Sequence, residues 1–599
     1  MTSIFLTPHQ RFLDVADLLP ESVAISFGAE YWTYHELAQR SRQMGHELVA
    51  CGVQPGAILS IYCGRCPQLI CAMLAIWQIG ASFILLDPQY PDKRLADYLA
   101  ASQASVILCP NVDSYALREP LAAVAARPIL IITVDKGPLL TVRPLPRLNQ
   151  EHSLAYIHFT SGTCGAPQGV IGTFAPLSHF FSWYVQKFAV VEQDRFSLLS
   201  SIGHDPLLRD IFVPLWQGAC IVIPEQSVIA NPAALRQWLL EQAISVIHTS
   251  PLRAEMIAHA AGCAPLAALR LLCVGGDQAR AALVPHLQRM APRAVIANFY
   301  GATETPQVVS YHLIEPHAPV QVSYDQPIPI GCAVPGFKLL IAEEDTAGIG
   351  EIVVRSRYLA AGYIGNARLT RERFRICEGE HIGGQYERDY YTGDLGYRLT
   401  NGDLILIGRR DDQVKILGYR VDCGELRQVI CTVPGVRDAV VYGTSDDYGA
   451  QQLACAIVPD QISGPGLEGA VRAYLSKQVP SHMVPSTMHI LECFPLTPAG
   501  KMDFIALRSL TLPPVYQAIT PCSDESVIRH MSAIWSEIFD LASLDESADF
   551  FELGGDSASA LKLVAKIRQH FQLQVSLLVI YDYPQLGEMA RHIASQKRV

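Results

Sequence analysis

The chain has 599 residues, more than one compact domain usually holds, so several domains are expected. Half of the residues are hydrophobic and 17% are charged, which supplies ample apolar surface for packed cores and excludes a globally disordered chain. The net charge is −11, and no run of Lys or Arg interrupts the acidic balance. We therefore expect no nucleic acid among the partners, because proteins that bind it usually carry a basic face or stripe.

The N-terminal segment has no basic stretch followed by a long apolar one, as a secretory signal would require. No run of 18 apolar residues occurs, so we predict no membrane helix and expect a soluble, cytoplasmic chain. The sixteen cysteines are scattered, and only Cys63 and Cys66 form a C-x-x-C motif. This pair is open to two interpretations: a redox motif, or small thiols packed between a buried strand and a helix.

From about residue 23 to residue 242, short apolar runs alternate with segments of helical periodicity. This alternation is typical of an α/β fold with largely parallel sheets. Buried strands are predicted over 57–63, 82–87, 104–109, 128–134 and 220–224. Helices are predicted over 94–102 and 233–242. Residues 318–356 contain more Pro, Gly and strand-forming residues, which indicates a more β-rich region.

Three amphipathic segments at 526–539, 558–571 and 585–595 predict a small helical bundle near the C-terminus. A stretch with Pro513, Pro514 and Pro521 and little charge precedes them, and its composition is that of a linker. We therefore predict an α/β multidomain protein. Its expected parts are a core of stacked β-sheets with helices (1–410), a small α+β subdomain (411–512), a linker (513–523) and a four-helix bundle (524–599).

The segment Phe-Thr-Ser-Gly-Thr-Cys-Gly-Ala-Pro-Gln-Gly-Val, residues 159–170, follows an apolar run. A loop of Gly, Ser and Thr after a strand offers backbone N–H groups and hydroxyls to a polyphosphate without bulky side chains. The segment lacks the Gly-Lys-[Ser/Thr] of a Walker A loop. By itself it is equally compatible with an ordinary glycine-rich turn.

Four further motifs follow: Asn-Phe-Tyr-Gly-Ala-Thr-Glu-Thr at 298–305, Tyr-Thr-Gly-Asp-Leu-Gly at 391–396, Gly-Arg-Arg-Asp at the start of 408–421, and Leu-Thr-Pro-Ala-Gly-Lys-Met-Asp at 496–503. In this order and spacing the five motifs resemble those of the adenylate-forming superfamily. This superfamily includes acyl-CoA ligases, luciferases and the adenylation domains of nonribosomal peptide synthetases. The resemblance covers most of residues 20–510 and implies an adenylate-forming core with its small C-terminal subdomain.

The resemblance also implies ATP and Mg²⁺ as cofactors and assigns a role to each matching residue. Tyr300 is expected to stack on adenine, Thr303 to meet the α-phosphate and Glu304 to hold Mg²⁺. Asp394 is expected to bind the ribose hydroxyls, with Arg409 beside it. The residues expected around the β- and γ-phosphates are Thr160, Ser161, Gly162 and Thr163.

Two more matches lie toward the end of the core, and one position departs from the pattern. Lys501 matches the cation that offsets the charge developing when a carboxylate attacks the α-phosphate. Asp411 matches the hinge of the small subdomain, although an ordinary turn aspartate would fit the local sequence equally well. Gln168 stands where the superfamily usually has lysine, and we expect this loss of charge to weaken the handling of pyrophosphate.

The sequence Phe-Phe-Glu-Leu-Gly-Gly-Asp-Ser, residues 550–557, precedes an amphipathic segment and resembles the attachment site of a peptidyl carrier domain. A serine at a helix N-terminus suits a phosphodiester anion, because the helix dipole and free N–H groups face it. The resemblance implies a covalent 4′-phosphopantetheine on Ser557, added by a phosphopantetheinyl transferase. The alternative is a simple helix N-cap serine.

Residues 201–216 are expected to carry the substrate specificity. In amino-acid-activating relatives an aspartate at the position of Asp205 pairs with the substrate ammonium, whereas acyl-CoA ligases generally lack it. Arg209 lies four residues later, on the same face of a helix that starts near Pro206, so the two charges could clamp a zwitterion. The alternative is that Arg209 pairs with Asp205 or Asp210 on a helix surface.

The segment around this pair is similar to the adenylation domains of α-aminoadipate reductases, in which such a clamp is thought to hold the α-amino and α-carboxyl groups. Matching the remaining pocket positions adds Pro206 and six further substrate-binding candidates: His248, Cys273, Gly275, Phe299, Gln307 and Val308.

We therefore predict ATP-dependent activation of an amino acid as aminoacyl-AMP and its transfer to the chain's own carrier domain. The substrate would be a dicarboxylic amino acid such as 2-aminoadipate. Because the chain ends at the carrier, we expect a loading module that passes its product to a downstream synthetase, tailoring or release enzyme. The alternatives are an acyl-CoA-type ligase, or a non-catalytic carrier or scaffold with a degenerate ATP site, which Gln168 would suggest.

Overall fold

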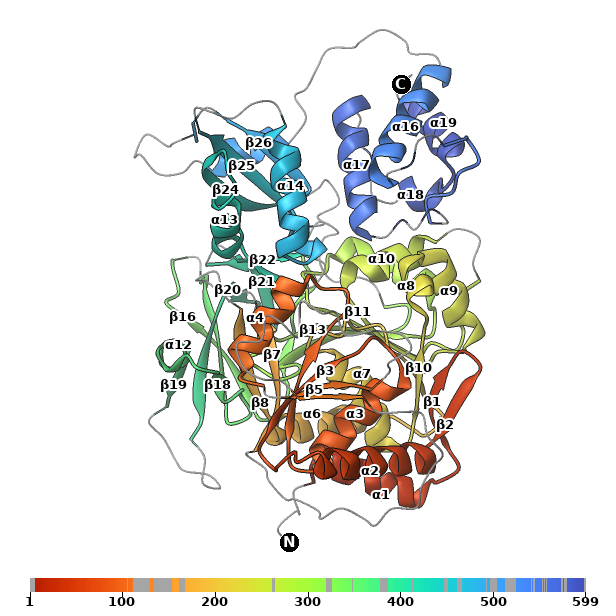
Figure 1. Cartoon of the computed structure of the whole chain (residues 1–599), viewed down its shortest axis with the longest axis vertical. Helices are drawn as coiled ribbons and strands as arrows, with labels where there is room; N and C mark the ends of the chain where they lie inside the picture. Colours follow the sequence, from red (N-terminus) through yellow and green to blue (C-terminus); the bar gives the residue numbers. More distant parts are fainter. Residues whose placement is uncertain are drawn as a thin grey trace. The chain divides into compact units, whose positions relative to one another are not determined.

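The structure is a computed structural model of the whole chain (Figure 1). It divides into two compact units, one of Met1–Glu225, Leu239–Pro251 and Pro265–Asp411, the other of Gln226–Trp238, Leu252–Ala264 and Asp412–Val599. The residues that the structure describes are 6–104, 106–110, 130–133, 153–160, 167–260, 264–318, 326–346, 348–377, 386–410, 413–416, 419–445, 451–460, 466–491, 493–495, 504–511, 524–539, 541, 544–551, 553, 555, 557–571, 575 and 579–596.

A mostly parallel sheet in the first unit contains the strands that were predicted from apolar runs in the N-terminal part. Its order is β18-β8-β7-β4-β3-β5-β6. Strands β3 to β7 run parallel, with α3 connecting β3 to β4 and α4 connecting β4 to β5, and β8 and β18 add antiparallel partners. The bounds are β3 (Ile58–Tyr62), β4 (Ser82–Leu86), β5 (Val106–Cys109), β6 (Leu130–Thr133), β7 (Leu154–Thr160), β8 (Gln168–Thr173) and β18 (Gly362–Tyr363).

A second large sheet of the same unit has the order β15-β14-β13-β12-β11-β9-β10-β1-β2. Its inner strands from β13 to β1 are parallel, so their carboxyl ends meet at one edge, where side chains from separate strands can form a site. The bounds are β1 (Val23–Phe27), β2 (Glu30–Thr33), β9 (Arg195–Ser197), β10 (Cys220–Ile223), β11 (Val246–Thr249), β12 (Leu271–Gly275), β13 (Val295–Tyr300), β14 (Ser310–Ile314) and β15 (Cys332–Ala333).

Helices α3, α6 and α7 form the apolar centre of this unit and lie side by side in Figure 1. Trp77 of α3 packs against Phe174 of α6 and, with ring centroids 4.5 Å apart, against Phe212 of α7. The helices in the ranges of the first unit are α1 (Pro8–Leu18), α2 (Tyr34–Ala50), α3 (Pro67–Gln78), α4 (Asp92–Ser102), α6 (Phe174–Lys187), α7 (Leu207–Gln217), α11 (Val284–Met290) and α12 (Ala367–Arg373). Along the chain, α8 (Gln226–Ala230) and α9 (Pro232–Glu241) follow β10, and α10 (Pro251–His259) follows β11.

The C-x-x-C pair lies between β3 and α3, as the packing interpretation requires. Both thiols are buried, with the two sulfur atoms 3.3 Å apart. The hydrogen bond with Cys66 and burial together raise the pKa of Cys63 well above its usual value. This favours packed neutral thiols over a reactive thiolate.

A smaller antiparallel sheet completes the first unit and supplies two of the predicted nucleotide residues. Asp394 of the long strand β20 lies directly opposite Arg409 of β21 in this sheet. The bounds are β16 (Phe337–Ala342), β17 (Gly350–Ser356), β19 (Phe374–Ile376), β20 (Arg388–Arg398) and β21 (Leu404–Arg409).

The second unit contains the predicted small α+β subdomain and the helical bundle, each with its own apolar core. The subdomain comprises β22 (Gln413–Ile416), β23 (Tyr419–Asp422), α13 (Cys423–Cys431), β24 (Val436–Ser445), β25 (Gln451–Pro459), α14 (Leu467–Gln478), β26 (Thr487–Ile490) and α15 (Phe504–Thr511). The bundle comprises α16 (Asp524–Phe539), α17 (Ser557–Phe571), α18 (Val579–Asp582) and α19 (Leu586–Gln596), of which the short α18 has no amphipathic period and was not predicted. The predicted linker lies outside the described residues.

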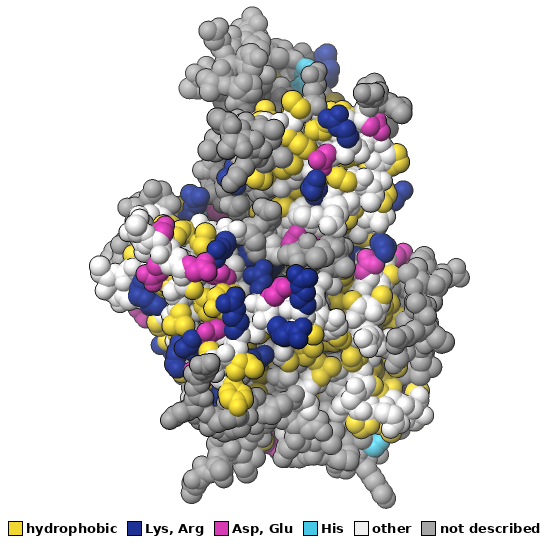
Figure 2. Space-filling model, turned by 90° about the vertical axis from the view of Figure 1, so that its left-hand side faces the viewer, with side chains coloured by type: hydrophobic (Ala, Val, Ile, Leu, Met, Phe, Trp, Pro, Cys, Tyr) yellow, Lys and Arg dark blue, Asp and Glu magenta, His cyan; other side chains and the backbone are white. Residues whose placement is uncertain are grey.

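The surface shown in Figure 2 carries Lys and Arg side chains next to Asp and Glu side chains. Exposed pairs such as Arg368–Glu372 and Lys338–Glu387 contribute little to stability, because water screens them. In the part of the chain that the structure describes, no helix is long and apolar enough to cross a membrane.

Strands β7 and β8 pack so closely at Gly172 that a larger residue there should destabilise the fold. Gly172 faces the buried ring of Tyr156, and a Cβ at residue 172 would lie 2.1 Å from its Cζ. We expect Gly172→Ala to lower the free energy of unfolding by about 1–3 kcal/mol through overpacking, measured as a shift of the urea midpoint. Gly408→Ala is the control, because a Cβ at residue 408 meets nothing within 4 Å. Equal midpoints for the two variants would contradict the prediction.

Candidate functional site

Three parallel strands bring several predicted pocket residues together. His248 of β11 is the register partner of Cys273 in β12, and Gly275 of β12 is the partner of Phe299 in β13. Gly275 allows this close approach, because a Cβ there would lie 2.8 Å from the backbone oxygen of Phe299. Val308 is also buried. The strands therefore form one wall of a candidate pocket.

Asp205 lies just before α7 and is buried. Its Oδ1 accepts a hydrogen bond of 3.1 Å from the hydroxyl of Thr303, and its backbone oxygen accepts one of 3.3 Å from the side-chain amide of Gln307. Burial raises the pKa of this carboxyl, while the charges of His158 and Arg209 oppose the rise. A cationic ligand beside it would stabilise the ionised form.

Arg209 belongs to the first turn of α7 and is only 6% exposed. Its guanidinium lies over the ring of Phe299, 5.8 Å from the centroid, and its Nε has no hydrogen-bond partner among the described residues. Within those residues it forms no ion pair with Asp205 or Asp210, so the surface-pair alternative is wrong. An anion beside this guanidinium would offset the desolvation of its charge.

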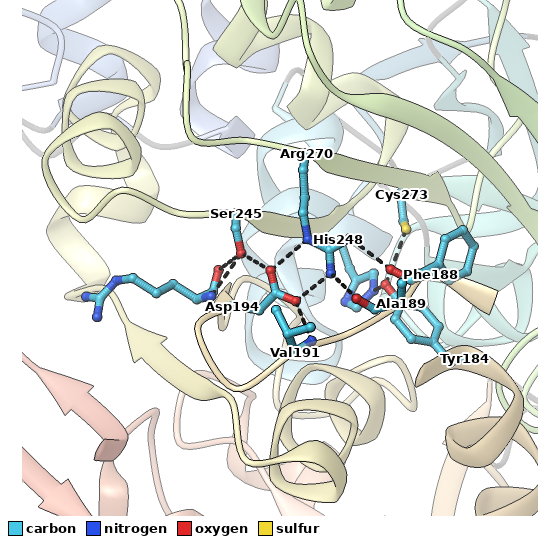
Figure 3. Close-up of polar contacts among 10 residues, drawn as sticks. Tyr184, Phe188, Ala189, Val191, Asp194, Ser245, His248, Arg270 and Cys273 are labelled. Atoms are coloured by element: carbon cyan, nitrogen blue, oxygen red, sulfur yellow. Dashed lines mark hydrogen bonds and ion pairs between the residues drawn. The ribbon is translucent and has the colours of Figure 1, made fainter. Parts of the chain in front are cut away.

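Asp210 instead binds other partners, which sequence reasoning missed. Its Oδ2 accepts from the backbone N–H of Ser200 at 3.0 Å, and its Oδ1 is 2.8 Å from Nδ1 of His248. The Nε2 of His248 is 2.7 Å from the hydroxyl of Tyr184, whose oxygen lies 3.6 Å from the sulfur of Cys273. Figure 3 shows Tyr184, His248 and Cys273 converging.

Three residues predicted to bind the nucleotide converge on the other side of β13. The hydroxyl of Tyr300 donates to Oδ2 of Asp394 at 2.7 Å, and the guanidinium of Arg409 pairs with Oδ1 of the same carboxylate. Arg409 also donates to the backbone oxygen of Thr392 at 3.1 Å. The structure thus joins three of the residues that were predicted to bind adenosine.

Glu304 is buried, and its Oε1 accepts a hydrogen bond of 2.8 Å from the hydroxyl of Tyr363. A carboxylate oxygen is the ligand type that Mg²⁺ prefers, so this residue fits the predicted metal role. Thr303 precedes it in the turn after β13, and its hydroxyl is bonded to Asp205. The residues predicted to bind phosphate and Mg²⁺ therefore lie in a turn that contacts the predicted substrate residue Asp205.

The predicted phosphate loop is described only at its two ends. Thr160 ends β7 and is the register partner of Gln168, the first residue of β8. The Oε1 of Gln168 accepts a hydrogen bond of 3.0 Å from Asn366, the N-cap of α12, so the glutamine contributes to local structure. The other predicted loop residues, Ser161, Gly162 and Thr163, lie outside the described residues, as do Lys501 and Asp411.

Ser557 is the first residue of α17, in agreement with a serine at a helix N-terminus. The bundle behind it is held by aromatic contacts, including Trp535 against Phe550 with ring centroids 5.5 Å apart. Gly555 permits the approach of this segment, because a Cβ there would lie 2.3 Å from the ring of Phe550.

Three family models match the chain over the segments that carry these residues. The model of the AMP-binding enzyme matches residues 12–364, which is more than half of the chain. The chain belongs to the AMP-binding enzyme family. The AMP-binding enzyme C-terminal domain matches residues 425–501, and the phosphopantetheine attachment site matches residues 530–593. This AMP-binding enzyme therefore combines an adenylation part with a carrier domain.

Similar proteins agree with this assignment. Malpinin synthetase of Mortierella alpina is 31% identical over 99% of this chain and 8% of its own length. L-2-aminoadipate reductase of Schizosaccharomyces pombe is 29% identical over 99% of this chain and 47% of its own length. The chain thus spans less than half of each of these relatives.

A solved structure also resembles this AMP-binding enzyme over nearly its whole length. It is a holo NRPS protein containing adenylation and PCP domains, bound to a vinylsulfonamide inhibitor. The TM-score is 0.75 and the identity 27%, with 98% of this chain and 97% of the other covered. The predicted superfamily and the predicted fold class are confirmed.

His158 was missed as well, although it shares a face of β7 with Tyr156 and Thr160 through the two-residue period of a strand. Its ring is buried, and its Nε2 has no partner among the described residues. Burial lowers the pKa of His158 to about 4, although the nearby charge of Asp205 opposes this.

The lowered pKa of His158 predicts that the stability of the fold depends on pH. Between pH 6.5 and 4 the unfolded chain protonates His158 and the folded chain does not, so stability falls as the pH falls. We expect His158→Gln to reduce the loss of Tm between pH 7 and pH 5, measured by calorimetry. Parallel Tm curves for the variant and the wild type would contradict the prediction.

Proposed function

We propose that this AMP-binding enzyme activates an amino acid with ATP and loads it onto its own carrier domain. The observation that carries the proposal is the buried pair of Asp205 and Arg209, whose charges are opposite but do not pair with each other. Asp205 would bind the substrate ammonium and Arg209 a substrate carboxylate. An acyl chain without an amino group would leave Asp205 without a cation to balance its buried charge.

The reaction has two balanced steps. A carboxylate oxygen of the amino acid attacks the α-phosphorus of ATP, the bond from this phosphorus to the pyrophosphate oxygen breaks, and aminoacyl-AMP forms. The acyl group then passes to a thiol, AMP leaves, and the thiol proton is released. When bound to Ser557, 4′-phosphopantetheine supplies that thiol.

The residues at the proposed nucleotide site would bind the ribose, Mg²⁺ and the phosphates of ATP. Asp394, oriented by Tyr300 and Arg409, would accept hydrogen bonds from the ribose hydroxyls. Mg²⁺, bound through Glu304, would offset phosphate charge. The residues proposed at the phosphates are Thr160, Ser161, Gly162, Thr163, Thr303 and Lys501, with Asp411 as the proposed hinge.

The proposed substrate is a dicarboxylic amino acid such as 2-aminoadipate. The unpaired charge of Arg209 supports a substrate that keeps one carboxylate ionised while the other is activated. The similarity to L-2-aminoadipate reductases agrees with this choice. The carrier would be primed by a phosphopantetheinyl transferase, and a synthetase, tailoring or release enzyme would accept the product. The domain boundaries at 410, 512 and 523 also remain proposals.

Amino-acid-dependent exchange of pyrophosphate into ATP tests the adenylation step. We expect the wild type to exchange with 2-aminoadipate but not with norleucine, which has a methyl group in place of the second carboxylate. Asp205→Asn should lower exchange at least about 100-fold, because it leaves the ammonium uncompensated. Asp97→Asn is the matched control, since Asp97 forms an exposed pair with Lys93.

The exchange assay also separates the alternatives. No exchange with any amino acid from folded protein would contradict the proposal. Activity with carboxylic acids that lack an amino group would instead indicate an acyl-CoA-type ligase. ATP binding without exchange would indicate a scaffold with a degenerate site.

Intact mass tests the carrier assignment. After incubation with CoA and a phosphopantetheinyl transferase, we expect one phosphopantetheine on the wild type and on Ser559→Ala, a control in the same helix, but none on Ser557→Ala. Modification that persists in Ser557→Ala, or no modification of the wild type, would contradict the carrier assignment.

A further inference from the structure

A buried polar chain adjoins the pocket, and the proposed reaction steps do not use it. It runs from Cys273 through Tyr184 and His248 to Asp210, with donor–acceptor distances of 3.6, 2.7 and 2.8 Å. All four side chains are at most 1% exposed. Side chains from α6, α7, β11 and β12 therefore meet in one hydrogen-bonded series.

The groups at the two ends of this series, the carboxylate of Asp210 and the thiol of Cys273, set the direction of its hydrogen bonds. An ionised carboxylate only accepts, so His248 must donate from Nδ1 to Asp210, and its Nε2 then accepts from the hydroxyl of Tyr184. The oxygen of Tyr184 remains an acceptor for the thiol of Cys273. Burial lowers the pKa of His248, which agrees with this neutral tautomer, and burial raises the pKa of Cys273 to about 12.

Asp210 also closes a loop around the substrate residues. Its second oxygen binds the N–H of Ser200, so one carboxylate joins the start of the 200–210 segment to its end. The carbonyl of Ser200 is fixed in turn by Arg65, whose Nη2 donates to it at 2.8 Å. Asp205 and Arg209 lie inside this closed segment.

Because these hydrogen bonds engage Asp210, the guanidinium of Arg209 stays available to bind a ligand. Neighbouring side chains on a helix point in different directions, so Asp210 faces Ser200 and His248 while Arg209 faces Phe299. Both oxygens of Asp210 already have donors, and Nε of Arg209 has no partner among the described residues. An anionic group of the ligand can then complete the contacts of Arg209.

We propose that Asp210 is a positioning residue of the substrate clamp. It closes the 200–210 segment, and it holds His248 in the Nδ1–H tautomer, whose Nε2 accepts from the hydroxyl of Tyr184. This proposal rests on the proposed function of Asp205 and Arg209. It adds two residues, Asp210 and Tyr184, that contact the clamp only indirectly.

The test compares Asp210→Asn with wild type in amino-acid-dependent pyrophosphate exchange. An amide cannot accept from both N–H donors, so one donor meets an NH₂ group and the closure weakens. We expect the KM for the amino acid to rise about 10–100-fold, while the KM for ATP changes less than about threefold. In an Arg209→Gln background the same change should have little further effect, because the two residues act through one clamp.

Asp194→Asn is the matched control. Asp194 is also a buried carboxylate, which accepts from Val191, Ser245 and Arg270 and lies outside the 200–210 segment (Figure 3). Asp194→Asn should lower the stability without a selective rise in the KM for the amino acid.

Tyr184→Phe is the second variant, for use if Asp210→Asn fails to fold. We expect it to raise the KM for the amino acid by a smaller factor, again with little change in the KM for ATP. Imidazole ¹⁵N shifts should identify His248 as the Nδ1–H tautomer in the wild type.

Equal increases in both KM values, full additivity with Arg209→Gln, or an Nε2–H tautomer would overturn the positioning role while leaving the proposed function intact. Failure of the wild type to exchange with any amino acid would overturn the proposed function and this inference together.

Discussion

The large unit of this protein is organised around charges that it buries. Burying an ionised side chain costs several kcal/mol unless hydrogen bonds or opposite charges compensate it. Asp210 and Asp394 have full sets of partners from the protein, whereas Arg209 has only the face of an aromatic ring. A ligand that supplies an opposite charge is therefore favoured beside Arg209.

Strand β13 lies between the proposed substrate pocket and the proposed nucleotide site. Successive residues of a strand point to opposite faces, and the contacts follow this alternation: Phe299 packs under Arg209, and Tyr300 binds Asp394. The turn after the strand brings Thr303 to Asp205 and Glu304 to Tyr363. One strand and its turn thus relate the proposed substrate pocket to the proposed nucleotide site, so that a carboxylate and a phosphate could meet between them.

Much of this arrangement could be predicted from local sequence. Apolar runs identified five of the parallel strands, β3, β4, β5, β6 and β10, because strands covered on both faces read as continuous hydrophobic segments. The ordered motifs identified the family and the neighbourhood of Tyr300, Asp394 and Arg409. Short elements such as α18 were missed, because one helical turn has no period to detect. The surface-pair alternative for Arg209 could not be rejected from sequence, since helical spacing indicates possible partners and not actual ones.

The sequence by itself determined the class of fold, the family and the residue types available for the reaction. Only the tertiary structure decided which of them are joined. Asp210 binds His248, 38 residues away, and His248 binds Tyr184, 64 residues away, through packing of separate strands and helices. Local periodicity reports contacts three or four residues apart, whereas contacts at these separations depend on how the sheets and helices stack.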